Sequence, residues 1–194
     1  MPVPPSRMPH REEPANALMP EPIMVADAIA SQIEALHHNL DGYDYADMFP
    51  HSEWLLGYRI PDFQRPVVWN EARRIRFVES AWLGLGLGTY CVNEIDGRGA
   101  KAHPMDRLLI DGRQRLFALD AYFRDAFPVL GYRWSEITQL DRRRFRGRNF
   151  ARIRIRLDDE TTLRDLYDRL NFGGVPHEES QRAVKANRKE NDQS

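Results

Sequence analysis

The sequence has little cysteine, no long apolar run and almost no net charge, and each of these features excludes some classes of protein. The single cysteine, Cys91, excludes an internal disulfide framework, so we expect a reduced core residue and a cytoplasmic location. No apolar stretch reaches the ~20 residues of a membrane-spanning helix, and the N-terminus lacks a signal-peptide core. A formal net charge of −1 gives no overall attraction to nucleic acid or membrane, so any basic surface must be local.

What is present is typical of one globular domain with tails. The chain has 194 residues, of which 42% are hydrophobic and 29% charged. Prolines crowd the first residues, which predicts a flexible tail over 1–22. We expect one domain over 23–178 and a polar, weakly helical or disordered tail over 179–194.

Hydrophobic periodicity and turn residues predict the elements of this domain. Helices are expected over 23–40, 71–83, 113–127 and 161–170, the second capped by Asn70. Strands are expected over 54–60, 89–95 and 108–110 and from Phe150 onwards, with a further short strand at 128–132. The glycine run 84–88 follows a helix and precedes a strand, the reverse of a dinucleotide fingerprint, so it is interpreted as a helix stop.

The segment from Leu108 to Leu116 organises the chain, because a buried strand end, an Asp-Gly turn and a helix follow one another there. The free N–H groups of such a helix N-terminus favour an anion. Arg113 and Arg115 add donors suited to phosphate, and Asp111 could hold Mg²⁺ on that phosphate. In the alternative interpretation Asp111 caps the helix and the arginines are solvated. A further alternative has Arg115 paired with Asp62 or Asp111.

Two further loops are candidates for ligand binding. Pro61 and Pro66 hold the first loop extended, so that Gln64 and Arg65 are presented on a stiff segment. Alternatively this loop is a connector whose Phe63 and Trp69 fill the core. The second loop begins at Asn171, and its Gly173 and Gly174 permit close backbone approach to a ligand.

Eight arginines crowd the segment 142–156, and from Phe150 they alternate with apolar residues. Period two indicates a half-buried strand with Arg152, Arg154 and Arg156 on one face. Such a face is a candidate DNA-binding surface. The alternative is a solvated face neutralised by nearby acids, namely Asp158, Asp159, Glu160, Asp165 and Asp168.

Three segments, in order, resemble a known family. They are Ile60-Pro61-Asp62-Phe63-Gln64-Arg65-Pro66-Val67-Val68-Trp69, Ile110-Asp111-Gly112-Arg113-Gln114-Arg115 and Arg169-Leu170-Asn171-Phe172-Gly173-Gly174-Val175-Pro176. Together they resemble the N-terminal domain of GmrSD-type restriction enzymes, of the ParB/sulfiredoxin-like superfamily. The resemblance implies an α+β fold, a small mixed sheet flanked by helices, in which an Asp-Gly-Gln-Gln-Arg turn binds nucleotide phosphate. Several members hydrolyse nucleoside triphosphates with a divalent metal.

The resemblance also implies roles for individual residues. Asp111, Gly112, Gln114 and Arg115 fall on the phosphate motif, Gln64 and Arg65 on a second one, and Asn171, Gly173 and Gly174 on the third. Arg65 and Arg115 would clamp phosphates, Asp111 would hold Mg²⁺ or orient water, and Gln64 and Gln114 would orient oxygens. Arg113 stands where the family usually has glutamine, which adds charge and keeps donors. Restriction enzymes of this type also carry an HNH-like nuclease domain, which we do not expect in the short segment after the third motif.

The sequence therefore predicts a nucleotide-binding, NTP-hydrolysing domain linked to DNA restriction, anti-phage defence or phage DNA modification. Its expected partners are a nucleotide with Mg²⁺, DNA and a separate nuclease or modification protein, and no membrane. One alternative is a non-catalytic DNA-binding module that uses the arginine strand. Another is a ParB-like nuclease that uses Asp111 or Glu94 with a metal, although no paired carboxylates support it.

Overall fold

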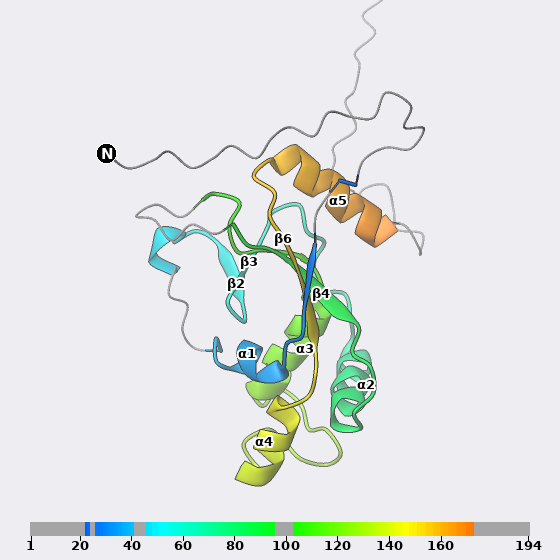
Figure 1. The fold of residues 1–194 in the computed structure, drawn as a ribbon. Coiled ribbons are helices and arrows are strands. Elements are labelled where there is room, and N and C mark those ends of the chain that lie inside the picture. Colours follow the sequence, from blue (N-terminus) through cyan, green and yellow to red (C-terminus); the bar gives the residue numbers. More distant parts are fainter. Residues whose placement is uncertain (1–21, 24–25, 41–45, 96–102, 173–194) are drawn as a thin grey trace, which may run out of the picture.

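The computed structural model describes residues 22–23, 26–40, 46–95 and 103–172, and it contains a six-stranded mixed sheet with helices on both faces (Figure 1). The strands run in the order β1-β6-β4-β5-β3-β2. They span Asp27–Ile29 (β1), Glu53–Leu55 (β2), Tyr58–Ile60 (β3), Thr89–Asn93 (β4), Leu108–Asp111 (β5) and Ala151–Ile155 (β6). The helices span Ile33–His37 (α1), Glu71–Trp82 (α2), Arg113–Phe123 (α3), Gln139–Arg146 (α4) and Glu160–Phe172 (α5), with a 3₁₀ turn at Ala46–Met48. The α+β prediction is confirmed.

Period-two alternation in the central strands supplies two cores, one on each face of the sheet. Tyr90, Val92 and Leu109 belong to the larger core, which α1 to α4 complete. Leu108 and Ile110 point to the smaller core, where α5 packs alone (Figure 1). The strand β5 is therefore covered on both sides, which fixes the position of its carboxyl end. No helix in the described ranges combines the length and apolar character needed to cross a bilayer.

The predicted helix over 23–40 is wrong in its first half. Residues Asp27–Ile29 form the edge strand β1, which pairs antiparallel with β6 so that Asp27 lies opposite Arg154. Only Ile33–His37 is helical, and Ile33 and Leu36 are its buried residues. The sheet edge offers backbone hydrogen-bond partners to a segment whose helical periodicity is weak, and this tertiary pairing overrides the local pattern.

The predicted single strand over 54–60 is a hairpin. Leu56 and Gly57 both have positive φ, 49° and 88°, as the two central residues of a tight type I′ turn require. The helix α3 ends at Phe123 rather than near 127, because Asp125 adopts a left-handed conformation with φ 59°. The short strand expected over 128–132 is reduced to one isolated bridge between Val129 and Tyr132.

The other expectations within the described residues hold. Asn70 caps α2, its side chain accepting a hydrogen bond from the backbone N–H of Arg73. The glycine run 84–88 ends that helix, and β6 is the half-buried arginine strand. Both predicted tails fall almost entirely outside the described residues.

Cys91 is a free thiol in the smaller core, and we expect it to be unreactive in the native protein. Burial, followed by the nearby Asp111 carboxylate, raises its pKa from 9.0 to about 12. The reactive thiolate is therefore scarce at pH 8. Ellman's reagent at this pH should label the native protein far more slowly than the guanidinium-unfolded protein. Equal labelling rates would show that the smaller core opens readily.

Candidate functional site

The candidate site forms where β5 ends and α3 begins. Asp111 is the last residue of β5, and Gly112 turns the chain with a left-handed φ of 101°. Among the described residues no side chain caps α3, so the N–H groups of its first turn are left for a ligand or water. These N–H groups form the positive end of the helix dipole, which favours an anion at this position.

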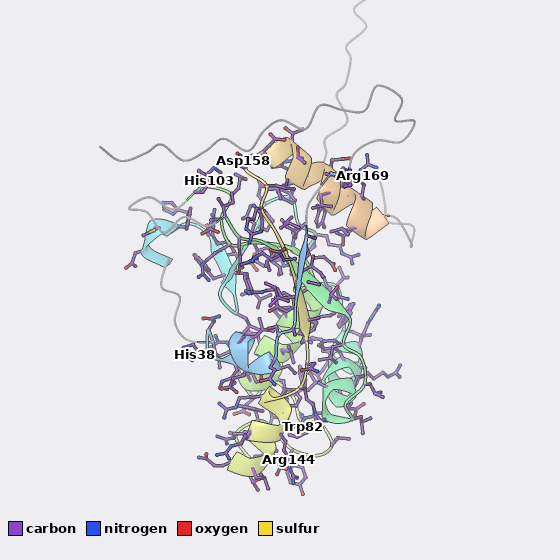
Figure 2. The ribbon with its side chains drawn as sticks, viewed as in Figure 1. His38, Trp82, His103, Arg144, Asp158 and Arg169 are labelled. Carbon is purple, nitrogen blue, oxygen red and sulfur yellow. The ribbon has the colours of Figure 1, made fainter. Side chains whose placement is uncertain are left out.

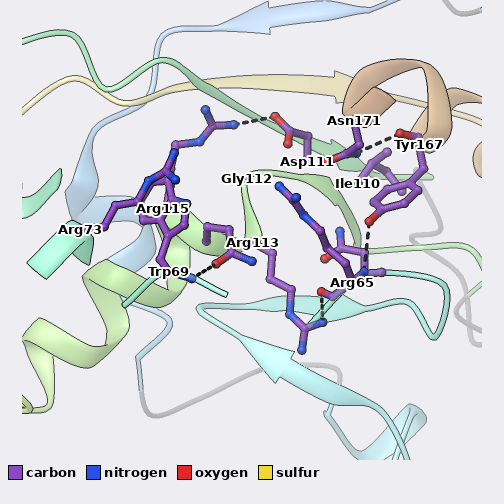
Figure 3. Close-up of a pocket in the computed structure, with 12 residues that line it drawn as sticks. Arg65, Trp69, Arg73, Ile110, Asp111, Gly112, Arg113, Arg115, Tyr167 and Asn171 are labelled. Carbon is purple, nitrogen blue, oxygen red and sulfur yellow. Dashed lines mark hydrogen bonds and ion pairs between the residues drawn. The ribbon is translucent and has the colours of Figure 1, made fainter. Parts of the chain in front are cut away.

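A pocket of about 140 Å³ at this turn brings the three sequence motifs together (Figure 3). The loop after β3 contributes Gln64 and Arg65, the β5–α3 turn contributes residues 110–115, and the end of α5 contributes Asn171. The other residues that line it are Trp69, Arg73 and Tyr167. The residues to which the resemblance assigns phosphate motifs therefore lie together where the structure describes them, and Asn171 belongs to α5 rather than to the predicted loop. Gly173 and Gly174 lie outside the described residues.

Arginines outnumber carboxylates in the described lining of the pocket. The arginines are Arg65, Arg73, Arg113 and Arg115, and the carboxylate is Asp111; Arg113 is also paired with Glu53, which lies outside this lining. Such a surplus of guanidinium groups beside a helix N-terminus suits a ligand with several negative charges, and phosphate matches guanidinium in geometry.

Arg115 and Asp111 form an ion pair in this pocket, with 2.5 Å between Nη2 and Oδ2. The two side chains are 26% and 34% exposed, so the pair is accessible from solvent. The alternative that Arg115 pairs with Asp111 is thus confirmed, whereas Asp62 pairs with Arg164 instead. A partly exposed pair contributes little to stability, which leaves both groups available to exchange partners when a ligand enters.

Arg113 and Gln114 hold the surrounding loops. The Arg113 guanidinium donates to the carbonyl of Arg65 and to both carboxylate oxygens of Glu53. The Gln114 side chain accepts from the backbone N–H groups of Val68 and Trp69 and donates to the carbonyl of Pro66. These contacts fix the loop that follows Arg65, so Gln114 acts as a positioning residue.

Gln64 is buried at 9% exposure, and its amide donates to the carbonyl of Leu109. Its Oε1 is buried and has no hydrogen-bond partner among the described residues. The neighbouring Tyr167 hydroxyl accepts from the backbone N–H of Arg65, and burial raises the pKa of Tyr167 above its ordinary value. Asn171 in turn donates to the carbonyl of Tyr167, one turn earlier in α5.

Sequence reasoning missed Arg73, Tyr167 and Trp69 as parts of the pocket. The Arg73 guanidinium lies 4.7 Å from the Trp69 ring centroid at the pocket edge (Figure 3). Its position three residues after the Asn70 cap placed it in the first turn of α2, which was the available signal. Tyr167 lies four residues before Asn171, a spacing that puts both on one helix face.

The arginine strand is engaged by acids on or next to the neighbouring strands. Arg152 donates to Glu94 and to the Tyr58 hydroxyl, while Arg154 and Arg156 share Asp27. The shared contacts lower the pKa of Asp27. Figure 2 shows Arg144, on α4, at the opposite end of the molecule from Asp158, so Asp158 does not neutralise the arginines of α4. The proposed DNA-binding role of Arg152, Arg154 and Arg156 stays a prediction.

A magnesium ion at the turn would find one carboxylate, Asp111. Within the described ranges no group of three or more His, Cys, Asp or Glu residues is arranged to hold a metal. This donor set fits Mg²⁺ that is shared with a ligand, because Mg²⁺ commonly binds one or two carboxylates together with phosphate oxygens and water. It does not fit a metal caged by protein ligands alone.

Comparison with known proteins agrees with the resemblance drawn from the three motifs. Residues 47–150, more than half of the chain, match the family described as "GmrSD restriction endonuclease, N-terminal domain". No curated protein and no solved structure matches the chain significantly. The matched range includes the loop of Gln64 and Arg65 and the whole β5–α3 turn, whereas the third motif, which begins at Arg169, lies outside it. Placement in the wider ParB/sulfiredoxin-like superfamily stays a prediction.

Proposed function

This chain belongs to the family of GmrSD restriction endonuclease N-terminal domains, and from that premise we propose that it binds and hydrolyses a nucleoside triphosphate in the service of DNA restriction. The observation that carries the proposal is the pocket at the start of α3, where four arginines and an uncapped helix N-terminus surround one carboxylate. Phosphoryl transfer depends mainly on positioning and on neutralising charge, and the pocket is equipped for both.

The residues divide into those that hold phosphate and those that hold the pocket. Arg65 and Arg115 bind phosphate oxygens, and the first N–H groups of α3 bind the same anion from the other side. Gln64 orients a water or a ligand hydroxyl. Arg113 and Gln114 keep the loop of Arg65 in place through the carbonyls and N–H groups described above. This assignment moves Gln114 from a catalytic role, which the resemblance implied, to a positioning role.

Asp111 would hold Mg²⁺, which supplies neutralisation of the phosphate charge when bound. The carboxylate is paired with Arg115 beforehand, so nucleotide binding separates the two groups. Arg115 then follows the phosphate, and Asp111 is left with its charge directed at the cation. In the ligand-free protein, each of the two groups therefore neutralises the charge of the other.

Cleavage of DNA is assigned to a separate nuclease, with which this domain would act. Apart from Asp111, none of the described residues that line the pocket is an acid that could complete a two-metal nuclease site. Glu94, the other candidate, is held by Arg152 at 2.9 Å. The ParB-like nuclease hypothesis therefore has no specific observation in its favour.

Isothermal titration of the protein with ATP, GTP, CTP and UTP, each with and without Mg²⁺, tests the proposal. We expect at least one nucleotide to bind, Mg²⁺ to strengthen its binding, and phosphate release to accompany prolonged incubation. The proposal is wrong if none of the four binds under either condition.

Replacing Arg115 by lysine should weaken nucleotide binding by about 1–2 kcal/mol, the size of a lost charge-assisted hydrogen bond. Lysine keeps the charge but lacks the planar two-pronged contact. Because the Arg115–Asp111 pair is partly exposed, the melting temperature without ligand should hardly change.

Arg124→Lys is the matched control for Arg115→Lys. Arg124 directly follows the last turn of the same helix and also forms an i,i+4 pair, with Asp120, but it does not line the pocket. Its replacement should leave nucleotide affinity unchanged. Early melting of Arg115→Lys with and without nucleotide would instead assign Arg115 a structural role.

A further inference from the structure

A second, larger pocket adjoins the phosphate pocket. Its volume is about 500 Å³, within the ~300–1,000 Å³ of ordinary small-molecule sites, whereas the first pocket is too small for a complete nucleotide. It lies beside the β2–β3 hairpin, the loop after β3 and the residues before β5, and we call it the side pocket. Its lining includes Ser52, Glu53, Phe63 and Met105.

The two pockets share Gln64 and Arg113. The Arg113 guanidinium donates to both carboxylate oxygens of Glu53, at 2.8 and 2.9 Å. This ion pair therefore lies at the junction of the two pockets. The Gln64 amide donates to the carbonyl of Leu109, and its Oε1 is buried with no donor among the residues that the structure describes. A buried acceptor of this kind is unfavourable until a donor reaches it.

A phosphate group at neutral pH presents acceptors, so it cannot satisfy the Gln64 oxygen. Ribose hydroxyls and the N–H groups of a base are donors and can. We propose, resting on the proposed function, that the side pocket binds the nucleoside of a nucleotide whose phosphates occupy the pocket at the start of α3. Gln64 then lies at the junction between the charged and the neutral part of the ligand.

The charges of the side pocket favour this orientation over the reverse. Three carboxylates line it, and each is paired with an arginine, Glu53 with Arg113 and both Asp62 and Glu160 with Arg164. Its Arg59 is already engaged by the Ser52 hydroxyl and by the carbonyls of Pro104 and Asp106. A polyphosphate would have to displace these contacts to reach an arginine, whereas a sugar or base can donate its hydroxyl and amino hydrogens to the carboxylate oxygens as they stand.

Trp69, an aromatic side chain at the phosphate pocket, is less suited to bind the base than the side pocket is. Trp69 has the Arg73 guanidinium 4.7 Å from its ring centroid and the Phe77 ring 5.7 Å away. Its ring is therefore already packed, and stacking of a base would require Arg73 to leave. The side pocket needs no such rearrangement.

The test compares ribonucleoside triphosphates with inorganic tripolyphosphate by isothermal titration. In the wild-type protein we expect the best nucleotide to bind about tenfold more tightly than tripolyphosphate, because only the nucleotide uses the side pocket. Ser52→Phe fills the side pocket and should remove that advantage while leaving tripolyphosphate affinity unchanged. Ser135→Phe, at an exposed site outside both pockets, is the control and should change neither affinity.

The outcomes separate the two proposals. Equal wild-type affinities for nucleotide and tripolyphosphate would overturn the side-pocket assignment and keep the phosphate site. Absence of binding by either ligand would overturn both. Photo-crosslinking of an azidopurine nucleotide to the wild-type protein needs no variant. Labelling of the peptides around Phe63 or Met105 supports the assignment, and labelling confined to Trp69 and Arg73 contradicts it.

Discussion

Replacement of Gly112 by alanine is expected to lower the free energy of unfolding by about 3 kcal/mol or more and to abolish nucleotide binding. A Cβ at this position would lie 2.7 Å from the Tyr90 Cβ and 3.2 Å from the Tyr90 Cα. Tyr90 cannot retreat, because its strand β4 is paired on both sides, with β5 and β6. The φ of 101° adds backbone strain for any residue with a side chain. Chemical denaturation and isothermal titration measure the two effects.

Gly131→Ala is the matched control for the Gly112 substitution. Gly131 also has a positive φ, of 89°, but no atom lies within 4 Å of its hypothetical Cβ. Its replacement should therefore cost only the strain of the left-handed conformation, about 1–2 kcal/mol. If both variants lose the same stability, close approach of β4 is not what requires glycine at the start of α3.

Replacement of Gln114 by leucine should destabilise the protein by about 2–4 kcal/mol, because it removes three hydrogen bonds to the backbone of residues 66–69 at once. Leucine is similar in size and leaves the packing largely filled. The released loop carries Arg65 and Trp69, so nucleotide affinity should fall at least about tenfold. Thermal melting with and without nucleotide, together with titration, measures the change.

Gln139→Leu serves as the control, because Gln139 is the exposed first residue of α4 and lies outside the pocket. Its effect should stay within about 0.5 kcal/mol. If Gln114→Leu keeps normal stability and nucleotide affinity but loses hydrolysis, Gln114 is a catalytic residue, as the sequence resemblance implied, and not a positioning residue.

The site was more predictable from the sequence than the edges of the sheet. Asp-Gly between an apolar run and a helical pattern identifies the β5–α3 turn, because glycine is the residue that adopts its left-handed φ without strain. The edge strand β1 was not predictable, because it is three residues long and exists only through pairing with β6. The hydrogen-bond partners of the Gln114 side chain were not predictable either, since they are backbone groups 45 or more positions away in the chain.

Ion-pair partners were the least predictable feature. The sequence places several acids directly after the arginine strand, yet Arg152 binds Glu94 and the other two strand arginines bind Asp27. These partners follow from strand order, which brings β1 and β4 to the two sides of β6. The place of Arg73 in the pocket was hidden for the same reason, since the packing of α2 against α3 brings the first turn of α2 to the pocket.

A crystal structure with a non-hydrolysable nucleoside triphosphate and Mg²⁺ shows directly whether the start of α3 binds the phosphates of a nucleotide. We expect phosphate density at the N-terminus of α3, within hydrogen-bond distance of Arg65 and Arg115, with Asp111 released from Arg115 and directed at the cation. Nucleotide bound elsewhere on the protein, with the Arg115–Asp111 pair intact at the empty turn, would contradict it.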